Sequence, residues 1–309
     1  MTPAEDACLR QVRRLVAAHL DGHPVHPVER LGEGTDHVAY RVAGRLIVRF
    51  TNEPDAAARA ELTRRELDLL RAVASVSPLA VPAPVFEDPD AGCIAYAALP
   101  GVPLLSLGPA EWASRAAGVA RELGAFLAAL HGLPAESRGA LVEIDHRRPG
   151  EWLEEAADTY ASVAGALPAA YRPAVSAFLA APPPEAPFGD VRLVFTHNDL
   201  GIEHVLVDPA TGWVTGVIDW GDAAVADPAA DFARLERDLG PVAVDAALAA
   251  YREGGGLVDG EALARLRARA AFYARCMVLE DLAFGLETGG NVYVEKSVAA
   301  LRWLFAAAP

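Results

Sequence analysis

The hydrophobic pattern changes character near residue 99. Before that point, β-type apolar runs alternate with polar turns, beside two patterns of helical period. The expected elements are helices at 4–20 and 55–75, strands within 30–42, a strand at 46–50 and a hairpin at 85–97. Beyond it, helical patterns dominate at 110–131, 150–165, 171–181, 241–253 and 259–287, a further segment begins at 231, and 291–306 closes the chain. We expect an α+β fold with a small β-rich first lobe and a large, mostly helical second lobe.

Residues 193–231 interrupt the helical half with three further β-type runs. The runs are 193–196, 204–207 and 213–218, separated by a polar loop and by a Pro/Gly turn at 208–212. If the last two runs form a hairpin, antiparallel pairing brings His204 close to Asp219 and to the loop that carries Asp199. Two carboxylates and an imidazole at one strand end are compatible with a hydrolase, a metal site or a kinase.

Size and charge narrow the class of protein. A chain of 309 residues exceeds one ordinary core, which favours two lobes, and Leu99-Pro100-Gly101-Val102-Pro103-Leu104 is the best boundary between them. The net charge of −15 argues against nucleic acid or anionic membrane as partners. It favours cationic ligands, although a generally acidic proteome would explain it equally well. Three scattered cysteines suit a reducing compartment, and without a signal peptide or an 18-residue apolar run we expect a cytoplasmic protein.

The first lobe contains a candidate phosphate site. Gly32 and Gly34 lie in a turn between two strands, where their backbone N–H groups could approach phosphate oxygens. Glu66 falls on the apolar stripe of its helix, which is costly unless a cation meets it, and Arg49 is the nearest candidate. An Arg49–Glu66 pair could present charge to phosphates or could be purely structural, and the sequence favours neither.

The 259–287 helix mixes aromatic and acidic residues. The stripe consists of Tyr273, Met277, Glu280, Asp281, Phe284 and Glu287. Facing a cleft, it would suit a polycationic and partly apolar ligand, whereas such stripes are commonly half core and half solvated surface. His131, at the end of the 110–131 helix, is expected to act as a C-terminal cap.

Taken in order, these motifs resemble the aminoglycoside and macrolide phosphotransferases, small-molecule kinases with a protein-kinase-like fold. The family loop is His-Gly-Asp-Leu followed by an asparagine five residues after the aspartate. This chain has His197-Asn198-Asp199-Leu200, with His204 in the asparagine place. Together with Ile218-Asp219-Trp220-Gly221-Asp222-Ala223 and Asp227 and Asp231 further on, that variant is most similar to the aminoglycoside 2''- and macrolide 2'-phosphotransferases.

The resemblance implies a role for each matching residue. Asp199 would accept the proton of the substrate hydroxyl, and His204 with Asp219 would hold Mg²⁺ on the nucleotide phosphates. The expected nucleotide-binding residues are Gly32, Gly34, Thr35, Arg49, Glu66, Tyr96, Ala97 and Leu99. Arg49 stands where most members have lysine, and an aromatic Tyr96 at the gatekeeper position favours GTP over ATP as donor. His197 is expected to bond backbone near Asp219, and Asp231 to hold the loop after the metal site.

The expected organisation is a nucleotide-binding lobe at 1–98, a hinge at 99–104 and a catalytic and substrate-binding lobe at 105–309. The preferred function is an antibiotic kinase acting on an aminoglycoside hydroxyl, with an antibiotic and a nucleotide as partners of a monomer. The expected substrate-binding residues are Asp222, Glu280, Asp281 and Glu287. A macrolide 2'-phosphotransferase, a small-metabolite kinase of the same fold and a non-catalytic kinase-like binding module remain as alternatives.

Overall fold

Alternating apolar residues in the first hundred positions form a five-stranded antiparallel sheet, in the order β1-β2-β3-β5-β4. The strands are β1 (Val28–Glu33), β2 (His37–Val42), β3 (Leu46–Thr51), β4 (Pro84–Asp88) and β5 (Cys93–Ala97). Residues of α1 (Pro3–His19) pack against one face of the sheet, where Val12, Val16 and Val48 are fully buried. The alternate residues of β3 face α2 (Ala56–Val76), so the strand presents Arg49 to that helix.

The computed structural model describes residues 3–33, 37–134, 141–183, 191–256 and 259–305, and the chain divides into two compact units. The first unit comprises residues 1–75 and 80–99, and the second comprises residues 76–79 and 100–309. The main change of unit therefore falls between Leu99 and Pro100. The mixed α+β architecture expected from the hydrophobic pattern is confirmed.

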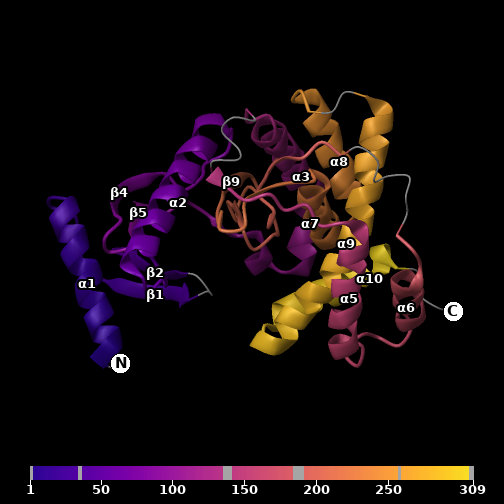
Figure 1. Ribbon diagram of the computed structural model, residues 1–309, viewed down its shortest axis with the longest axis horizontal. Helices are drawn as coiled ribbons and strands as arrows, with labels where there is room; N and C mark the ends of the chain where they lie inside the picture. Colours follow the sequence, from indigo (N-terminus) through magenta and orange to yellow (C-terminus); the bar gives the residue numbers. More distant parts are fainter. Residues whose placement is uncertain (1–2, 34–36, 135–140, 184–190, 257–258, 306–309) are drawn as a thin grey trace. The chain divides into compact units, whose positions relative to one another are not determined.

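The second unit is mostly helical. Its elements are β6 (Val102–Pro103), a 3₁₀ turn η1 (Leu104–Leu107), α3 (Pro109–His131), α5 (Pro149–Val163), α6 (Arg172–Ala180), β7 (Val194–Thr196), β8 (Val205–Val207), β9 (Val214–Val217), β10 (Ala224–Ala226), α7 (Ala229–Leu239), α8 (Pro241–Glu253), α9 (Gly260–Thr288) and α10 (Asn291–Leu304). Helix α3 packs along α8, and α9 packs along both α7 and α10 (Figure 1). A methyl group at Gly124 would overlap the carbonyl of Ala247, so glycine allows α3 and α8 to approach closely. None of the described helices is long and apolar enough to cross a membrane.

Two small sheets in this unit position one loop. Strands β7 and β10 pair with each other, and β8 lies between β6 and β9. Val205 pairs with Val217, and the N–H of Ile218 donates to the carbonyl of His204 at 3.0 Å, so the hairpin has the predicted register. The loop that connects β7 to β8 contains Asp199, and the end of β9 leads directly to Asp219.

Candidate functional site

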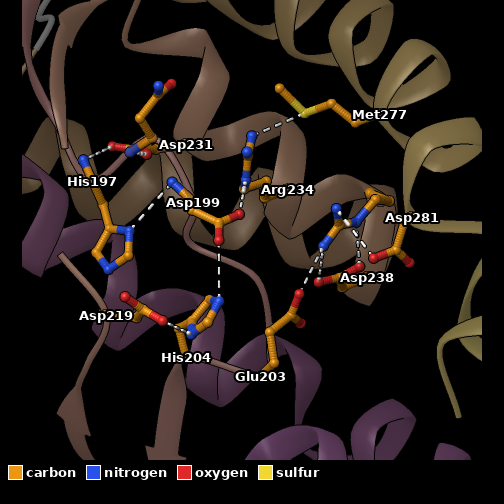
Figure 2. A network of polar contacts seen from close by, with 12 residues as sticks. His197, Asp199, Glu203, His204, Asp219, Asp231, Arg234, Asp238, Met277 and Asp281 are labelled. Carbon is orange, nitrogen blue, oxygen red and sulfur yellow. Dashed lines mark hydrogen bonds and ion pairs between the residues drawn. The ribbon is translucent and has the colours of Figure 1, made fainter. Parts of the chain in front are cut away.

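Asp199 has both carboxylate oxygens engaged (Figure 2). Arg234 Nε donates to Oδ1 at 2.8 Å, and His204 Nε2 lies 3.1 Å from Oδ2. Burial alone would raise the pKa of Asp199, but the hydrogen bond from His204 and the charge of Arg234 hold it well below its usual range. Asp199 is therefore an ionised hydrogen-bond acceptor at neutral pH, and its side chain remains partly exposed.

The backbone of this loop is held by Asp231, in the first turn of α7. The N–H groups of His197 and Asn198 donate to its two carboxylate oxygens at 3.1 and 2.8 Å. Asn198 has a φ of 62°, a left-handed conformation that asparagine tolerates better than most residues. The prediction that Asp231 holds the loop after the metal site is wrong, because its oxygens bind the segment that precedes Asp199.

Two histidines that the sequence singled out have structural partners. The N–H of Asp199 donates to His197 Nδ1 at 3.3 Å, so His197 Nε2 carries the proton and donates to the carbonyl of Ile218 at 3.0 Å. Complete burial lowers the pKa of His197, which fits this neutral form. His131 is not a helix cap: it is buried, and its Nε2 lies 3.1 Å from Asp231 Oδ2.

His204 and Asp219 form the candidate metal pair. His204 Nδ1 lies 3.8 Å from Asp219 Oδ2, and the Asp219 side chain is half exposed. When His204 Nε2 carries a proton and donates it to Asp199, the Nδ1 lone pair points to the side where Asp219 lies (Figure 2). The described residues contain no group of three or more histidine, cysteine or carboxylate side chains arranged to hold a metal. The Asp219 carboxylate is the kind of oxygen ligand that magnesium prefers, and the His204 ring could add one nitrogen ligand.

Three residues on one face of α7 organise the loop from end to end. Asp231, Arg234 and Asp238 are spaced i, i+3 and i+7, which places them on successive turns of one helical face. Asp231 binds the start of the loop, Arg234 binds Asp199, and Asp238 Oδ2 accepts the N–H of Ile202 at 3.1 Å. Arg234 and Asp238 were not predicted from the sequence, because their spacing from Asp231 indicates one helical face but not what that face contacts.

A buried ionic cluster joins the same loop to α9 and α10. Lys296 is 1% exposed, and its Nζ lies 3.0 Å from Glu203, 3.3 Å from Asp238 and 3.2 Å from Asp281. Arg237 pairs with the same three carboxylates, at 3.6 Å from Glu203, 2.6 Å from Asp238 and 3.5 Å from Asp281. Two cations thus compensate three acids, and Glu203 ties the residue before His204 into the cluster (Figure 2).

The prediction that Asp281 faces a ligand is wrong. Its side chain is 5% exposed and also accepts a hydrogen bond from Ser297 at 2.7 Å, so its charge is balanced by partners inside the protein. Glu280 and Glu287 are exposed on α9. Asp222 is exposed beyond β9, and partial loss of solvation together with the charges of Asp199 and Asp219 raises its pKa.

A cavity of about 180 Å³ lies next to the loop on the side of Asn198. Trp152 and Tyr273 line it, with their ring centroids 5.1 Å apart. Its two aspartates are already paired, Asp145 with Arg147 at 2.9 Å and Asp227 with Arg269 at 2.7 Å. Asn198 Nδ2 donates to Asp145 at 3.3 Å, which links the cavity wall to the loop.

In the first unit, Arg49 and Glu66 form an ion pair of 3.0 Å. His37, which the sequence analysis did not identify, joins them: Arg49 Nη2 donates to its Nδ1 at 2.9 Å, and its Nε2 lies 3.3 Å from Glu66. Gly32 is exposed near the end of β1, whereas Gly34 and Thr35 lie outside the described residues.

The hinge candidates belong to the end of the first unit. Tyr96 is half-buried on β5 opposite Ile47, Ala97 is exposed opposite Leu46, and Leu99 is the last residue before the change of unit.

Residues 27–272 match the model of the phosphotransferase enzyme family. The chain therefore belongs to that family, and its fold is kinase-like.

The relatives include solved structures of both aminoglycoside and macrolide phosphotransferases. The GDP and kanamycin complex of APH(2'')-IIIa is 21% identical, with a TM-score of 0.65 over 94% of this chain and 96% of that one. Macrolide 2'-phosphotransferase MphH from Brachybacterium faecium is 26% identical, with a TM-score of 0.59 over 96% and 98%. The uncharacterized protein YcbJ of Bacillus subtilis is 30% identical over 105 residues, a match that spans a third of each protein (34% of this chain and 33% of YcbJ).

Proposed function

We propose that the protein transfers the γ-phosphate of a magnesium–nucleoside triphosphate to a hydroxyl of an antibiotic or a similar small molecule. The observation that carries the proposal is the geometry around Asp199. An ionised carboxylate, held from two sides, lies beside a histidine whose other ring nitrogen faces a half-exposed aspartate. This arrangement suits phosphoryl transfer, which depends mainly on positioning and charge neutralisation.

In the proposed reaction the hydroxyl oxygen bonds to the γ-phosphorus while the bond to the β–γ bridging oxygen breaks. The nucleoside diphosphate leaves with that oxygen, and the hydroxyl proton passes to Asp199. Because the pKa of Asp199 is low, its main contribution is to orient the hydroxyl, with proton transfer late in the reaction. Magnesium, when bound, neutralises charge on the phosphates, and His204 and Asp219 are the residues that would hold it.

The first unit supplies the proposed nucleotide contacts. Arg49, fixed by Glu66 and His37, would place a guanidinium against the phosphates, and backbone groups near Tyr96 and Ala97 would recognise the base. We propose GTP as the preferred donor because Tyr96 is bulky, with ATP as the alternative.

Two acceptor classes remain, and each has its own support. The net charge of −15 and the exposed Glu280 and Glu287 favour an aminoglycoside, although the burial of Asp281 removes one acid from that argument. The cavity beside Asn198, lined by Trp152 and Tyr273, favours a macrolide instead. At about 180 Å³ it would accept one ring of a drug rather than a whole one.

The test is release of nucleoside diphosphate with ATP and with GTP across aminoglycosides, macrolides and simple hydroxylated metabolites. We expect at least one hydroxylated acceptor to stimulate turnover well above basal nucleotide hydrolysis, and phosphorylated product to appear by mass spectrometry. Binding of magnesium–nucleotide without stimulated turnover by any acceptor would instead support a kinase-like binding module and would refute the proposal.

A further inference from the structure

His37 and Arg49 lie on the same face of the five-stranded sheet. Strands β2 and β3 pair antiparallel with Ala39 opposite Arg49, so His37 is two residues along β2 from the position opposite Arg49. Residues two apart on a strand face the same side, and a diagonal neighbour on the next strand is within reach of a long side chain. Glu66 contacts both residues from α2. A histidine, an arginine and a glutamate from three elements therefore meet at one place.

The three side chains form a closed ring of contacts. Arg49 Nη1 lies 3.0 Å from Glu66 Oε1, and Arg49 Nη2 donates to His37 Nδ1 at 2.9 Å. His37 Nε2 lies 3.3 Å from Glu66 Oε2 and closes the ring. The side chains are between 13% and 24% exposed, so water screens the contacts only in part and a ligand can still reach the ring. Each terminal nitrogen of the guanidinium thus has its own anchor.

The hydrogen bonds of the ring define the protonation state of His37. A guanidinium has donors but no acceptor, so the Nδ1 atom that receives Arg49 Nη2 carries a lone pair. The imidazole is then neutral, and its proton is on Nε2, the nitrogen that faces Glu66. His37 therefore orients the guanidinium without adding a negative charge, whereas a second carboxylate at this place would make the ring net negative and repel an anionic ligand.

We propose that His37 is a positioning residue for the nucleotide phosphates, and that it acts through Arg49 alone. It fixes the plane of the guanidinium and leaves the charge balance between Arg49 and Glu66 unchanged. This inference rests on the proposed phosphotransferase function. It adds to the phosphate contact a residue that no motif in the sequence identified.

The physical reason is the shape of arginine. Its charge is spread over a planar fork that binds an oxyanion well only when the plane is correctly oriented, and one carboxylate alone can pair with it in more than one orientation. His37 supplies a second anchor from β2 and removes that freedom. Lysine carries a compact ammonium charge with no plane to orient, so in Arg49→Lys the histidine should no longer matter for phosphate binding.

The test is a double-mutant cycle on nucleotide affinity, measured by calorimetry without an acceptor. His37→Phe and His37→Ala remove the accepting nitrogen, and His37→Asn offers an amide oxygen in its place; each is made with Arg49 and with Arg49→Lys. Magnesium–GTP and magnesium–ATP are compared with guanosine and adenosine, which lack phosphates. The matched controls are His23→Phe, between α1 and β1, and Arg64→Lys, at an exposed position of α2. Thermal melting verifies that each variant is folded.

With Arg49 present, His37→Phe and His37→Ala should weaken triphosphate binding by about tenfold, because one hydrogen bond to a charged group is lost. Binding of the nucleosides should stay unchanged, and His37→Asn should keep most of the triphosphate affinity. In the Arg49→Lys background, the same substitutions should change triphosphate affinity by less than about twofold. The two controls should alter neither nucleoside nor triphosphate binding.

Two results would overturn the inference and leave the proposed function intact. One is an equal loss of nucleoside and triphosphate affinity in His37→Phe and His37→Ala, and the other is the same loss with Arg49 as with Arg49→Lys. Either would show that His37 only supports the fold of the sheet. A wild type that binds no magnesium–nucleotide would refute the proposed function together with this inference.

Discussion

At the scale of single residues, the chemistry of the site depends on which side-chain atoms already have hydrogen-bond or ion-pair partners within the protein. Asp199 uses one oxygen for Arg234 and the other for His204, so its carboxylate has a defined orientation before any ligand arrives. Burial alone would lower the pKa of His204, but the hydrogen bond to Asp199 and its charge raise it. Because Nε2 of His204 contacts Asp199, the other ring nitrogen, Nδ1, faces Asp219.

Replacing Asp199 by asparagine tests its proposed role. The variant keeps the shape of the side chain but loses the charge that accepts the hydroxyl proton, so kcat should fall by about 10²- to 10⁴-fold. Affinity for magnesium–nucleotide, measured by calorimetry, should change little. Glu253→Gln, an acid-to-amide change at an exposed end of α8, should leave both quantities unaltered. Full turnover in Asp199→Asn would remove Asp199 from the reaction.

The metal assignment makes a separate prediction. Asp219→Ala should abolish the magnesium dependence of nucleotide binding, because a single histidine is a poor magnesium ligand by itself. Calorimetric titrations with GTP are compared in magnesium and in chelator, for the wild type and the variant. Magnesium-dependent binding that persists in the variant would show that Asp219 does not hold the ion.

At the scale of elements, α7 holds the loop of residues 197–202 in place. Successive turns of one helical face bind the start, the middle and the end of residues 197–202, through Asp231, Arg234 and Asp238. A rigid helix thereby fixes an irregular loop whose own strands, β7 and β8, are only three residues long.

The Asp231 contact should contribute measurably to stability. In Asp231→Asn, one loop N–H faces an amide donor, and His131 loses the fully buried carboxylate that it contacts. We expect the free energy of unfolding, measured by urea denaturation, to fall by about 2–4 kcal/mol.

The difference between the wild type and this variant should depend on pH. Burial would raise the pKa of Asp231, but the hydrogen bond from His131 and the neighbouring charges lower it. A lowered folded-state pKa means that the stabilisation is present above the unfolded pKa, about 4, and is lost as the pH falls through the folded value. A difference that grew on acidification would contradict this account.

The ionic cluster allows the contribution of α10 to the stability of the folded protein to be tested. Lys296→Met leaves three buried acids with one cation, and it should destabilise the protein by about 3–5 kcal/mol. Adding Asp281→Asn to that variant should recover part of the loss, because one uncompensated charge is then removed. Arg302→Met, at an exposed position of the same helix, serves as the control and should change stability little.

At the scale of the whole molecule, the proposed function assigns roles to residues of both units, to Arg49 in the first and to Asp199 in the second. Bound nucleotide should therefore stabilise the folded chain by mass action. We expect magnesium–GTP to raise the melting temperature more than magnesium–ATP at equal concentration. An equal or larger shift with ATP would contradict the proposed preference for GTP, and Asp219→Ala should remove the magnesium-dependent part of the shift.

The sequence by itself predicted the local structure and which of the candidate site residues lie close together. Its apolar periods indicated the helices and strands, since period and turn chemistry are local properties. The hairpin register expected from the turn at 208–212 places His204 near Asp219, as the structure has it. The Arg49–Glu66 pair followed from a single charge on an apolar stripe.

Only the tertiary structure decided which charges are available to a ligand. From the sequence, Asp281 was expected to face a ligand from a helix of mixed aromatic and acidic residues. In the structure, ion pairs with Lys296 and Arg237 neutralise its charge. Arg234 carried no motif, yet it contacts Asp199 from a helix 35 residues further on. Contacts between side chains that are far apart in the sequence depend on how the elements pack, and they produce no periodic pattern in the sequence. The elements themselves are specified by the local sequence.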